Sequence, residues 1–248
     1  MMQVQKNHAG KAAVVTGATR GIGKAVSLRL AGLGVHICAI AREQGELDDL
    51  RKEIEAFGVQ CVTCIANVSD FAALGEAMRQ AFDRFHRIDI LLNNAGTGVA
   101  CPFEELTLED IDETIDVNLK GVIYGIKLAL PFMAKTGGNI INVSSMSGTR
   151  GIPDPVNNNG IYTATKFGVN GFSECMEKYL LKYNIHVTTL CPGSTATSWW
   201  ERWTHSFGRD RMIPTEYIAD IVELILNCPD HVLFKQLRIL PDAEADNF

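Results

Sequence analysis

The sequence predicts an α/β fold of three layers, in which one parallel sheet is covered by helices on both faces. Three observations lead to this prediction. Short β-branched or apolar runs alternate with longer runs of helical periodicity over 248 residues, and such alternation is typical of parallel strands joined by crossover helices. The composition, 46% hydrophobic and 21% charged, is that of an ordinary globular protein. The candidate breaks at 137–138, 151–160 and 194–211 are only loop-sized, so residues 1–248 are expected to form a single domain.

The elements follow one another in a regular order. The first expected strand covers residues 12–16, where apolar and β-branched residues stand before a glycine-rich turn, and the first helix covers 24–33. Each later short apolar run is assigned to a strand and each longer amphipathic run to helical structure. The further expected strands are 35–41, 59–66, 88–93, 139–144, 185–191 and 236–240. The further expected helical segments are 45–57, 69–85, 107–135, 161–183 and 215–226.

Charge and hydropathy exclude several classes of partner. Lys and Arg number 23 and Asp and Glu number 29, which gives a net charge of −6. Such a chain is a poor ligand for nucleic-acid phosphates or an anionic membrane surface. The first ten residues lack the apolar core of a secretory signal, and no segment approaches the length of an apolar membrane span. We therefore expect a cytoplasmic protein that binds a small molecule, without nucleic-acid or membrane partners.

The seven cysteines are odd in number and lie mostly in apolar stretches. This usage predicts reduced, buried thiols in an intracellular protein. Cys61 and Cys64 form a C-x-x-C pair, but no second Cys/His pair follows at the spacing of a zinc site, and the pair lies in an expected strand. We expect both to belong to the core, and we expect no metal site.

The loop after the first strand predicts a nucleotide site. Its glycines, Gly17, Gly21 and Gly23, stand between an expected strand and an expected helix. Glycines let the backbone turn tightly and approach a pyrophosphate, while a helix N-terminus offers unpaired N–H groups and a partial positive charge. The spacing G-x-x-x-G-x-G differs from the usual G-x-G-x-x-G, and alone it could be a simple glycine-rich turn. In this context it predicts a doubly wound sheet of Rossmann type.

Two arginines predict the form of the dinucleotide. The second strand ends Ala39-Ile40-Ala41-Arg42, without the acidic residue that commonly binds the adenosine ribose. Arg20 in the loop adds a second guanidinium, and two guanidiniums can bind a 2′-phosphate that a carboxylate would repel. We therefore expect NADP(H). The alternative is that Arg20 and Arg42 are solvated surface residues.

With these residues in place, the chain resembles the short-chain dehydrogenase/reductase family, and in particular its 3-oxoacyl reductase-like members. The resemblance covers nearly the whole chain and rests on motifs in a specific order. They are Thr16-Gly17-x-x-x-Gly21-x-Gly23, Asn93-Asn94-Ala95-Gly96, Asn118, Ser144-Ser145, Tyr162-x-x-x-Lys166 and Pro192-Gly193.

The spacing of Tyr162 and Lys166 has a chemical reason of its own. Four residues on a helix turn through about 400°, so both side chains project from one face. A free tyrosine has a pKa of about 10, and a neighbouring ammonium favours the phenolate, so Lys166 is expected to lower the pKa of Tyr162. Alone, Y-x-x-x-K is more often a surface pair.

The resemblance implies roles for four residues. Tyr162 would be the general acid in carbonyl reduction and the base in alcohol oxidation, while Lys166 would also bind the nicotinamide ribose. Ser145, rather than Ser144, would hold the reacting oxygen. Asn118 would support a water next to Lys166; its alternative is a helix-surface or cap residue.

The resemblance also implies the contacts of the cofactor. Asn67 stands where the family usually has aspartate, so the adenine contact there is less secure. The full set of expected cofactor contacts is Gly17, Thr19, Arg20, Gly21, Ile22, Gly23, Arg42, Asn67, Val68, Asn94, Ala95, Gly96, Tyr162, Lys166, Pro192, Gly193, Thr195 and Thr197.

Two segments are candidates for the substrate wall. Sixteen residues separate Ser145 from Tyr162, and the excess over many family members falls at 154–160, a loop that either borders the substrate or is a neutral insertion. In this family the 194–211 segment is a mobile lid. Here it contains Trp199, Trp200, Trp203 and Phe207, and the spacing of 199, 203 and 207 suggests one face of a helix. These aromatic residues favour an apolar ligand, or else a core or subunit contact.

The leading hypothesis is an NADPH-dependent carbonyl reductase that also oxidises the corresponding alcohol. A 3-oxoacyl thioester, a ketosteroid-like compound and a xenobiotic ketone are candidate substrates. A sugar or polyol dehydrogenase is the alternative within the enzyme class, and the tryptophans argue mildly against it. A non-catalytic NADP(H)-binding sensor is the alternative outside it, because fold alone does not establish turnover. The family resemblance implies a homodimer or homotetramer.

Overall fold

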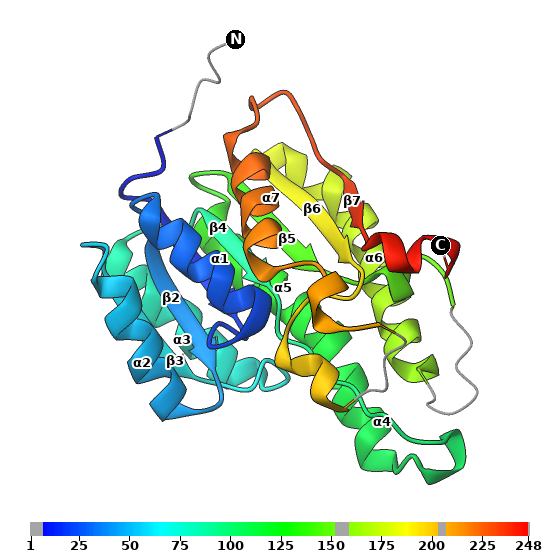
Figure 1. The fold of residues 1–248 in the computed structure, drawn as a ribbon. Coiled ribbons are helices and arrows are strands. Elements are labelled where there is room, and N and C mark those ends of the chain that lie inside the picture. Colours follow the sequence, from blue (N-terminus) through cyan, green and yellow to red (C-terminus); the bar gives the residue numbers. More distant parts are fainter. Residues whose placement is uncertain (1–6, 152–158, 203–206, 248) are drawn as a thin grey trace.

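The computed structural model describes residues 7–151, 159–202 and 207–247 and confirms the α/β fold (Figure 1). Within these residues, seven parallel strands form one sheet in the order β3-β2-β1-β4-β5-β6-β7. The strands are β1 (Ala12–Thr16), β2 (His36–Ala41), β3 (Cys61–Ile65), β4 (Ile90–Asn93), β5 (Gly138–Val143), β6 (Ile185–Pro192) and β7 (Gln236–Ile239).

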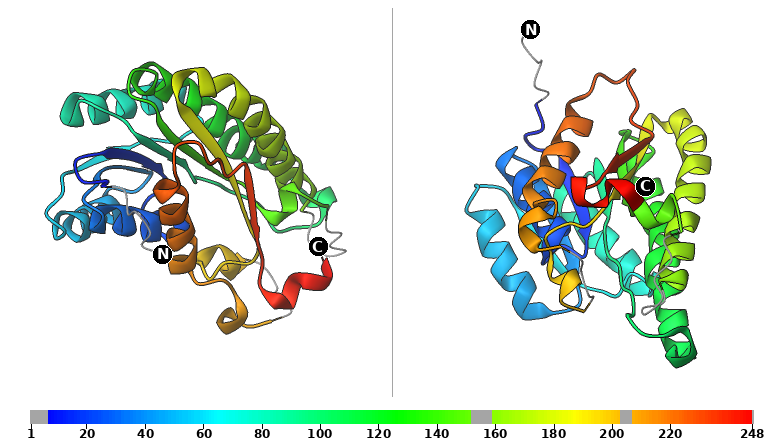
Figure 2. Two further views of the ribbon diagram at one scale, coloured as in Figure 1. Left: turned by 90° about the horizontal axis from the view of Figure 1, so that it is seen from above. Right: turned by 45° about the vertical axis from the view of Figure 1, so that its right-hand side comes forward.

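Helices cover both faces of this sheet, so that the molecule has three layers (Figure 2). One face carries α1 (Gly21–Gly32), α2 (Gln44–Glu55) and α7 (Thr215–Asn227). The other carries α3 (Phe71–Phe85), α5 (Gly121–Met133) and α6 (Gly160–Leu180). The short helix α4 (Leu108–Ile115) contacts α6. The remaining short helical turns are η1 (Phe103–Glu105), η2 (Asp116–Lys120), η3 (Met146–Gly148), η4 (Leu181–Tyr183), η5 (Ser198–Arg202), η6 (Arg209–Arg211) and η7 (Asp242–Asn247).

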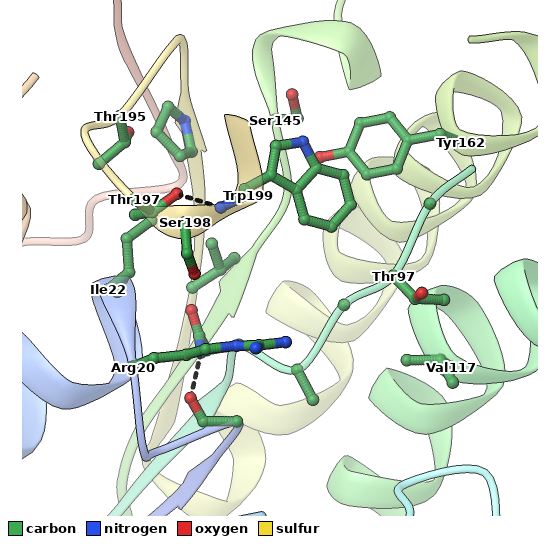
Figure 3. A pocket seen from close by; sticks show the side chains of 18 of the residues that line it. Arg20, Ile22, Thr97, Val117, Ser145, Tyr162, Thr195, Thr197, Ser198 and Trp199 are labelled. Atoms are coloured by element: carbon green, nitrogen blue, oxygen red, sulfur yellow. Dashed lines mark hydrogen bonds between the residues drawn. The ribbon is translucent and has the colours of Figure 1, made fainter. Parts of the chain in front are cut away.

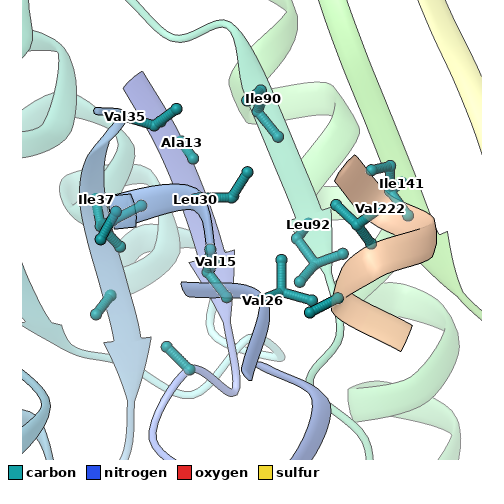
Figure 4. Close-up of a cluster of buried hydrophobic side chains, with 14 of the residues drawn as sticks. Ala13, Val15, Val26, Leu30, Val35, Ile37, Ile90, Leu92, Ile141 and Val222 are labelled. Atoms are coloured by element: carbon teal, nitrogen blue, oxygen red, sulfur yellow. The ribbon is translucent and has the colours of Figure 1, made fainter. Parts of the chain in front are cut away.

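The two cores follow from the alternation of side chains along each strand. In β1, Ala13 and Val15 belong to the cluster under α1, while Ala12 and Val14 belong to the cluster under α3. Figure 4 shows the first of these clusters, with Leu30 of α1 buried among strand residues. Burying one such side chain stabilises the fold by about 1.5–3 kcal/mol.

The helical region expected over 107–135 is divided. A π-helical turn, η2, lies between α4 and α5, and Asn118 is buried within it. Single π-turns inside helices occur frequently at functional sites. The sequence pattern does not show this division, because one wider turn barely changes the spacing of the apolar residues.

Two glycines bring α5 close to its neighbours. A Cβ at Gly121 would lie 2.7 Å from the Val68 side chain, and a Cβ at Gly125 would collide with the Asn93 side-chain oxygen. Within the part of the chain that the structure describes, that oxygen is the buried side-chain atom without a hydrogen-bond partner. The close approach of α5 therefore depends on the absence of side chains at both positions.

The cysteines only partly follow the expectation. All seven are free thiols, and Cys61 and Cys64 are buried as expected, together with Cys38 and Cys191. The expectation of burial is wrong for the exposed Cys175 and for the half-buried Cys101 and Cys228, because these three lie outside the central strands and core-facing helix positions. Among the described residues, no helix is long and apolar enough to cross a membrane, and no cluster of three or more His, Cys, Asp or Glu side chains could hold a metal ion.

Candidate active site

A cavity of about 630 Å³ opens along the carboxyl edge of the sheet (Figure 3). The strand order reverses between β1 and β4, and in doubly wound sheets the crevice at this point is where ligands bind. Of the expected site residues, all but Gly23 and Asn118 line this cavity. The cavity therefore brings together segments from Gly17 to Thr197 of the chain.

The glycine loop is fixed to the end of β4. The Thr16 hydroxyl accepts hydrogen bonds from the backbone N–H groups of Asn94 and Ala95, at 3.0 and 3.1 Å. The Asn94 side-chain amide donates to the carbonyl oxygens of Thr16 and Gly17. Gly17 and Gly21 have φ angles of +62° and +53°, which L side chains rarely adopt. The loop thus presents the N-terminus of α1 to the cavity.

Gly23, in the first turn of α1, packs against the side of the glycine loop that faces away from the cavity. A Cβ at this position would collide with the Gly17 carbonyl oxygen and lie 2.7 Å from the Asn94 side-chain nitrogen. The third glycine therefore serves the packing of helix against loop.

The end of the cavity beside the glycine loop and β2, called the far end below, carries charges of both signs. Arg20 and Arg42 line it, and both are exposed. Arg42 contacts the Glu113 carboxylate at 3.4 Å, and the Thr19 hydroxyl donates to Glu46 at 2.6 Å. Sequence reasoning missed Glu46, because its position on α2 belongs to no motif.

The opposite end of the cavity, beside α6 and the end of β5, holds the expected reactive groups. Tyr162 is half-buried in the cavity wall, and its hydroxyl is hydrogen-bonded to that of Ser145. The Lys166 ammonium lies 5.5 Å from the Tyr162 ring centroid and donates to the Val143 carbonyl oxygen at 2.9 Å. The Ser144 hydroxyl instead donates to the Lys166 carbonyl oxygen. Helix α6 and the end of β5 therefore bring Lys166 together with the hydroxyls of Tyr162 and Ser145, as the spacing predicted.

The protonation of this pair differs from the expectation. Burial raises the pKa of Tyr162 to about 12, although the hydrogen bond with Ser145 acts in the opposite direction. Burial lowers the pKa of Lys166 to about 8. The expectation that Lys166 lowers the pKa of Tyr162 is wrong for this structure, because desolvation of the phenol dominates and the ammonium is directed at Val143.

Asn118 connects two parts of the site. Its side-chain oxygen accepts from the Thr97 N–H at 2.8 Å, and its amide donates to the Thr97 carbonyl and the Thr165 hydroxyl. The side chain thus connects the loop that follows β4 to α6. The expected contact with a water next to Lys166 stays a prediction.

The described residues before position 203 in the 194–211 segment lie over the reactive groups. The Trp199 ring packs against Tyr162 with centroids 5.4 Å apart. The Trp200 indole N–H donates to the Thr195 carbonyl oxygen, and the Thr197 methyl group lies 3.0 Å from where a Cβ of Gly21 would be. Trp203 and the loop residues 154–158 lie outside the described residues, and the described part of the expected helix is only the short turn η5.

The base of this segment is held by a carboxylate that sequence reasoning missed. Glu244 of η7 lines the cavity and accepts hydrogen bonds from the hydroxyl and the backbone N–H of Ser194. A Cβ at Gly193 would collide with the same carboxylate. At the other end of the segment, Arg211 forms an exposed ion pair with Asp242 at 3.1 Å.

We expect Glu244→Ala to loosen the segment. Hydrogen bonds to a charged group contribute about 1.5–3 kcal/mol each when buried, so partly exposed ones still slow local opening by about tenfold. Limited trypsin cleavage at Arg209 and Arg211 should therefore accelerate about tenfold. Asp49→Ala is the control, because it removes an exposed ion pair with Lys52 on α2, away from this segment, and such a pair contributes less than about 1 kcal/mol. Equal cleavage rates for Glu244→Ala and the unchanged protein would contradict this role.

The fold and this site define an oxidoreductase with a dinucleotide-binding fold. A family model described as short chain dehydrogenase matches residues 11–206, and the chain belongs to the short-chain dehydrogenase family.

Relatives and solved structures agree with this assignment. A 3-oxoacyl-[acyl-carrier-protein] reductase of Thermotoga maritima is 36% identical over 194 residues, which are 78% of this chain and 77% of that protein. The solved structure of a short chain dehydrogenase from Burkholderia cenocepacia in complex with NADP has a TM-score of 0.87 at 29% identity, covering 97% of this chain and all of that one. A short chain dehydrogenase of Mycobacterium paratuberculosis bound to NAD has a TM-score of 0.82 at 25% identity, covering 94% of this chain and 97% of that one.

Proposed function

We propose that the protein is an NADPH-dependent carbonyl reductase that also oxidises the corresponding alcohol. The observation that carries this proposal is the continuity of one cavity from the glycine loop at Gly17 to the Ser145–Tyr162–Lys166 group. A cavity of about 630 Å³ that joins a phosphate-type loop to these reactive groups supports the binding of a dinucleotide with a substrate beside it.

The residues present fit a dinucleotide. The loop is closed to Cβ atoms at Gly17, Gly21 and Gly23, which leaves backbone N–H groups at the start of α1 as the phosphate ligands. Asn67 and Val68 would contact the adenine, Ala95 and Gly96 leave room for the adenosine, and Lys166 would bind the nicotinamide ribose. When bound, the reduced nicotinamide supplies a hydride to the carbonyl carbon.

The protein's own residues then handle the oxygen. The hydroxyls of Ser145 and Tyr162 would donate hydrogen bonds to the carbonyl oxygen, where negative charge develops. Tyr162, whose high pKa keeps the phenol protonated at neutral pH, would transfer its proton to that oxygen. Trp199 would exclude water from the reacting groups, with the 194–211 segment acting as a lid.

The preference for NADP(H) is supported by Arg20 and Arg42 at the far end of the cavity. We expect Arg42→Asp combined with Arg20→Ala to shift the ratio of kcat/KM for NADPH over NADH by about 10- to 100-fold toward NADH, because two charge-assisted hydrogen bonds are lost. Arg79→Ala, an exposed arginine on α3, serves as the control. An unchanged ratio would reject the assignment.

Turnover is tested with a panel of ketones, aldehydes, acyl thioesters, sugars and alcohols, followed by nicotinamide absorbance with both cofactors. Reduction of ketones with NADPH is expected. Preferential oxidation of polyols would favour the sugar dehydrogenase, and tight NADPH binding without any turnover would favour the sensor.

The proposal extends to location and assembly. Seven free thiols support a reducing, cytoplasmic setting. Exposed Phe167 and Tyr179 on α6 support association as a homodimer or homotetramer through this helix.

A further inference from the structure

Gly98, Tyr162 and Trp199, from three separate segments, meet around the ring of Tyr162. A Cβ at Gly98 would lie 3.0 and 3.1 Å from two carbons of the Trp199 six-membered ring, and 3.5 Å from Tyr162. Trp199 and Tyr162 are themselves in ring contact, with their planes inclined by 43° (Figure 3). All three line the cavity.

Gly98 determines where the indole can lie. Its φ angle is not in the left-handed region, so the backbone would accept alanine there. The limit is steric, because a methyl group at 3.0 Å would push the indole away from Tyr162. The contact of Trp199 with Tyr162 therefore depends on the absence of a side chain at Gly98.

With no side chain at Gly98, the Trp199 indole forms one flat aromatic wall of the cavity beside Tyr162, the proposed proton donor. In an aryl or conjugated ketone, the carbonyl and the adjacent group share one plane. With its carbonyl oxygen at the Ser145 and Tyr162 hydroxyls, such a substrate would have this flat group beside Trp199, whose ring contacts that of Tyr162. An offset aromatic contact stabilises such a substrate beyond its buried area, whereas a puckered aliphatic ring makes no aromatic–aromatic contact.

We propose that Trp199 and Gly98 determine specificity, and that they select carbonyl compounds with a planar aryl or conjugated group next to the carbonyl. This inference rests on the proposed carbonyl reductase function. It goes beyond that function by naming the shape and electronic character of the substrate.

The test uses two ketones of the same carbon count, acetophenone and cyclohexyl methyl ketone, with NADPH. The measured quantity is the ratio of their kcat/KM values. Intrinsic reactivity differs between the two ketones, but it cancels when the ratio is compared between variants. We expect Trp199→Leu to lower the ratio by roughly 2- to 12-fold, the range of an aromatic contact, and Trp199→Phe to restore most of it.

Gly98→Ala is the second variant. It leaves the indole in the protein but displaces it, so we expect the ratio to fall in the same direction. Gly151→Ala, where an added Cβ meets nothing within 4 Å, is the matched control and should leave the ratio unchanged.

The outcomes separate the two proposals. A ratio that is the same in the unchanged protein, Trp199→Leu and Gly98→Ala would overturn the inference while leaving the carbonyl reductase function in place. Absence of NADPH consumption by the unchanged protein with every carbonyl compound tried would overturn both.

Discussion

Replacing Tyr162 by phenylalanine is expected to lower kcat for carbonyl reduction by about 10²- to 10⁴-fold, the range of a lost general acid. The ring remains, so its contact with Trp199 persists, and only the hydroxyl that bonds Ser145 is removed. The dissociation constant for NADPH, measured by fluorescence titration, should change little. This combination identifies Tyr162 as the proton donor.

A matched control lies on the same stretch of chain. Tyr179 is half exposed near the end of α6, and the Lys182 ammonium lies 3.8 Å from its ring centroid. Tyr179→Phe removes a phenol beside a lysine outside the cavity and should leave turnover unchanged. Near-normal turnover of Tyr162→Phe would disprove the proposed chemistry.

Gly23→Ala is expected to damage both stability and cofactor binding. The added methyl group collides with the Gly17 carbonyl oxygen, which is backbone, so the loop itself must move. Overpacking of this kind destabilises a fold by about 1–3 kcal/mol. For a chain of this length, that lowers the midpoint of thermal unfolding by roughly 2–12 °C. The NADPH dissociation constant should rise at least about tenfold, because a displaced loop misplaces N–H groups whose charge-assisted hydrogen bonds contribute about 1.5–3 kcal/mol each.

Gly45→Ala provides the comparison for this stability measurement. Gly45 lies in α2, and an added Cβ there meets nothing within 4 Å. Alanine favours a helix over glycine by up to about 1 kcal/mol, so this variant should be as stable as the unchanged protein or more so. Equal midpoints and equal NADPH affinities for Gly23→Ala and Gly45→Ala would show that the close packing of the loop is not required.

The sequence predicted most of the fold because the rules involved are local. The first strand ends at Thr16 as expected, since Gly17 interrupts the apolar run. Helix α1 begins at Gly21, three positions before the expected start, because glycines hide the first helical turn from a reading of propensity. The motifs also predicted which residues meet, since the carboxyl ends of parallel strands share one edge.

Features that depend on tertiary packing could not be predicted in this way. Glu244 contacts Ser194 across a separation of 50 residues, and no spacing rule relates them. Gly98 acquires its importance only from the position of Trp199. The pKa of Tyr162 was misjudged because the sequence shows the neighbouring charge of Lys166 but not the loss of water around the phenol.

The close seating of α5 has a practical meaning for protein engineering. Exchanging glycine for alanine within helices is a common route to greater heat resistance, because alanine restricts the unfolded chain. In this fold the route is open at Gly45 and Gly171, where an added methyl group meets open space. It is closed at Gly121 and Gly125, where an added methyl group would meet the side chains of Val68 and Asn93 and push α5 away from the loop after β3 and from the end of β4.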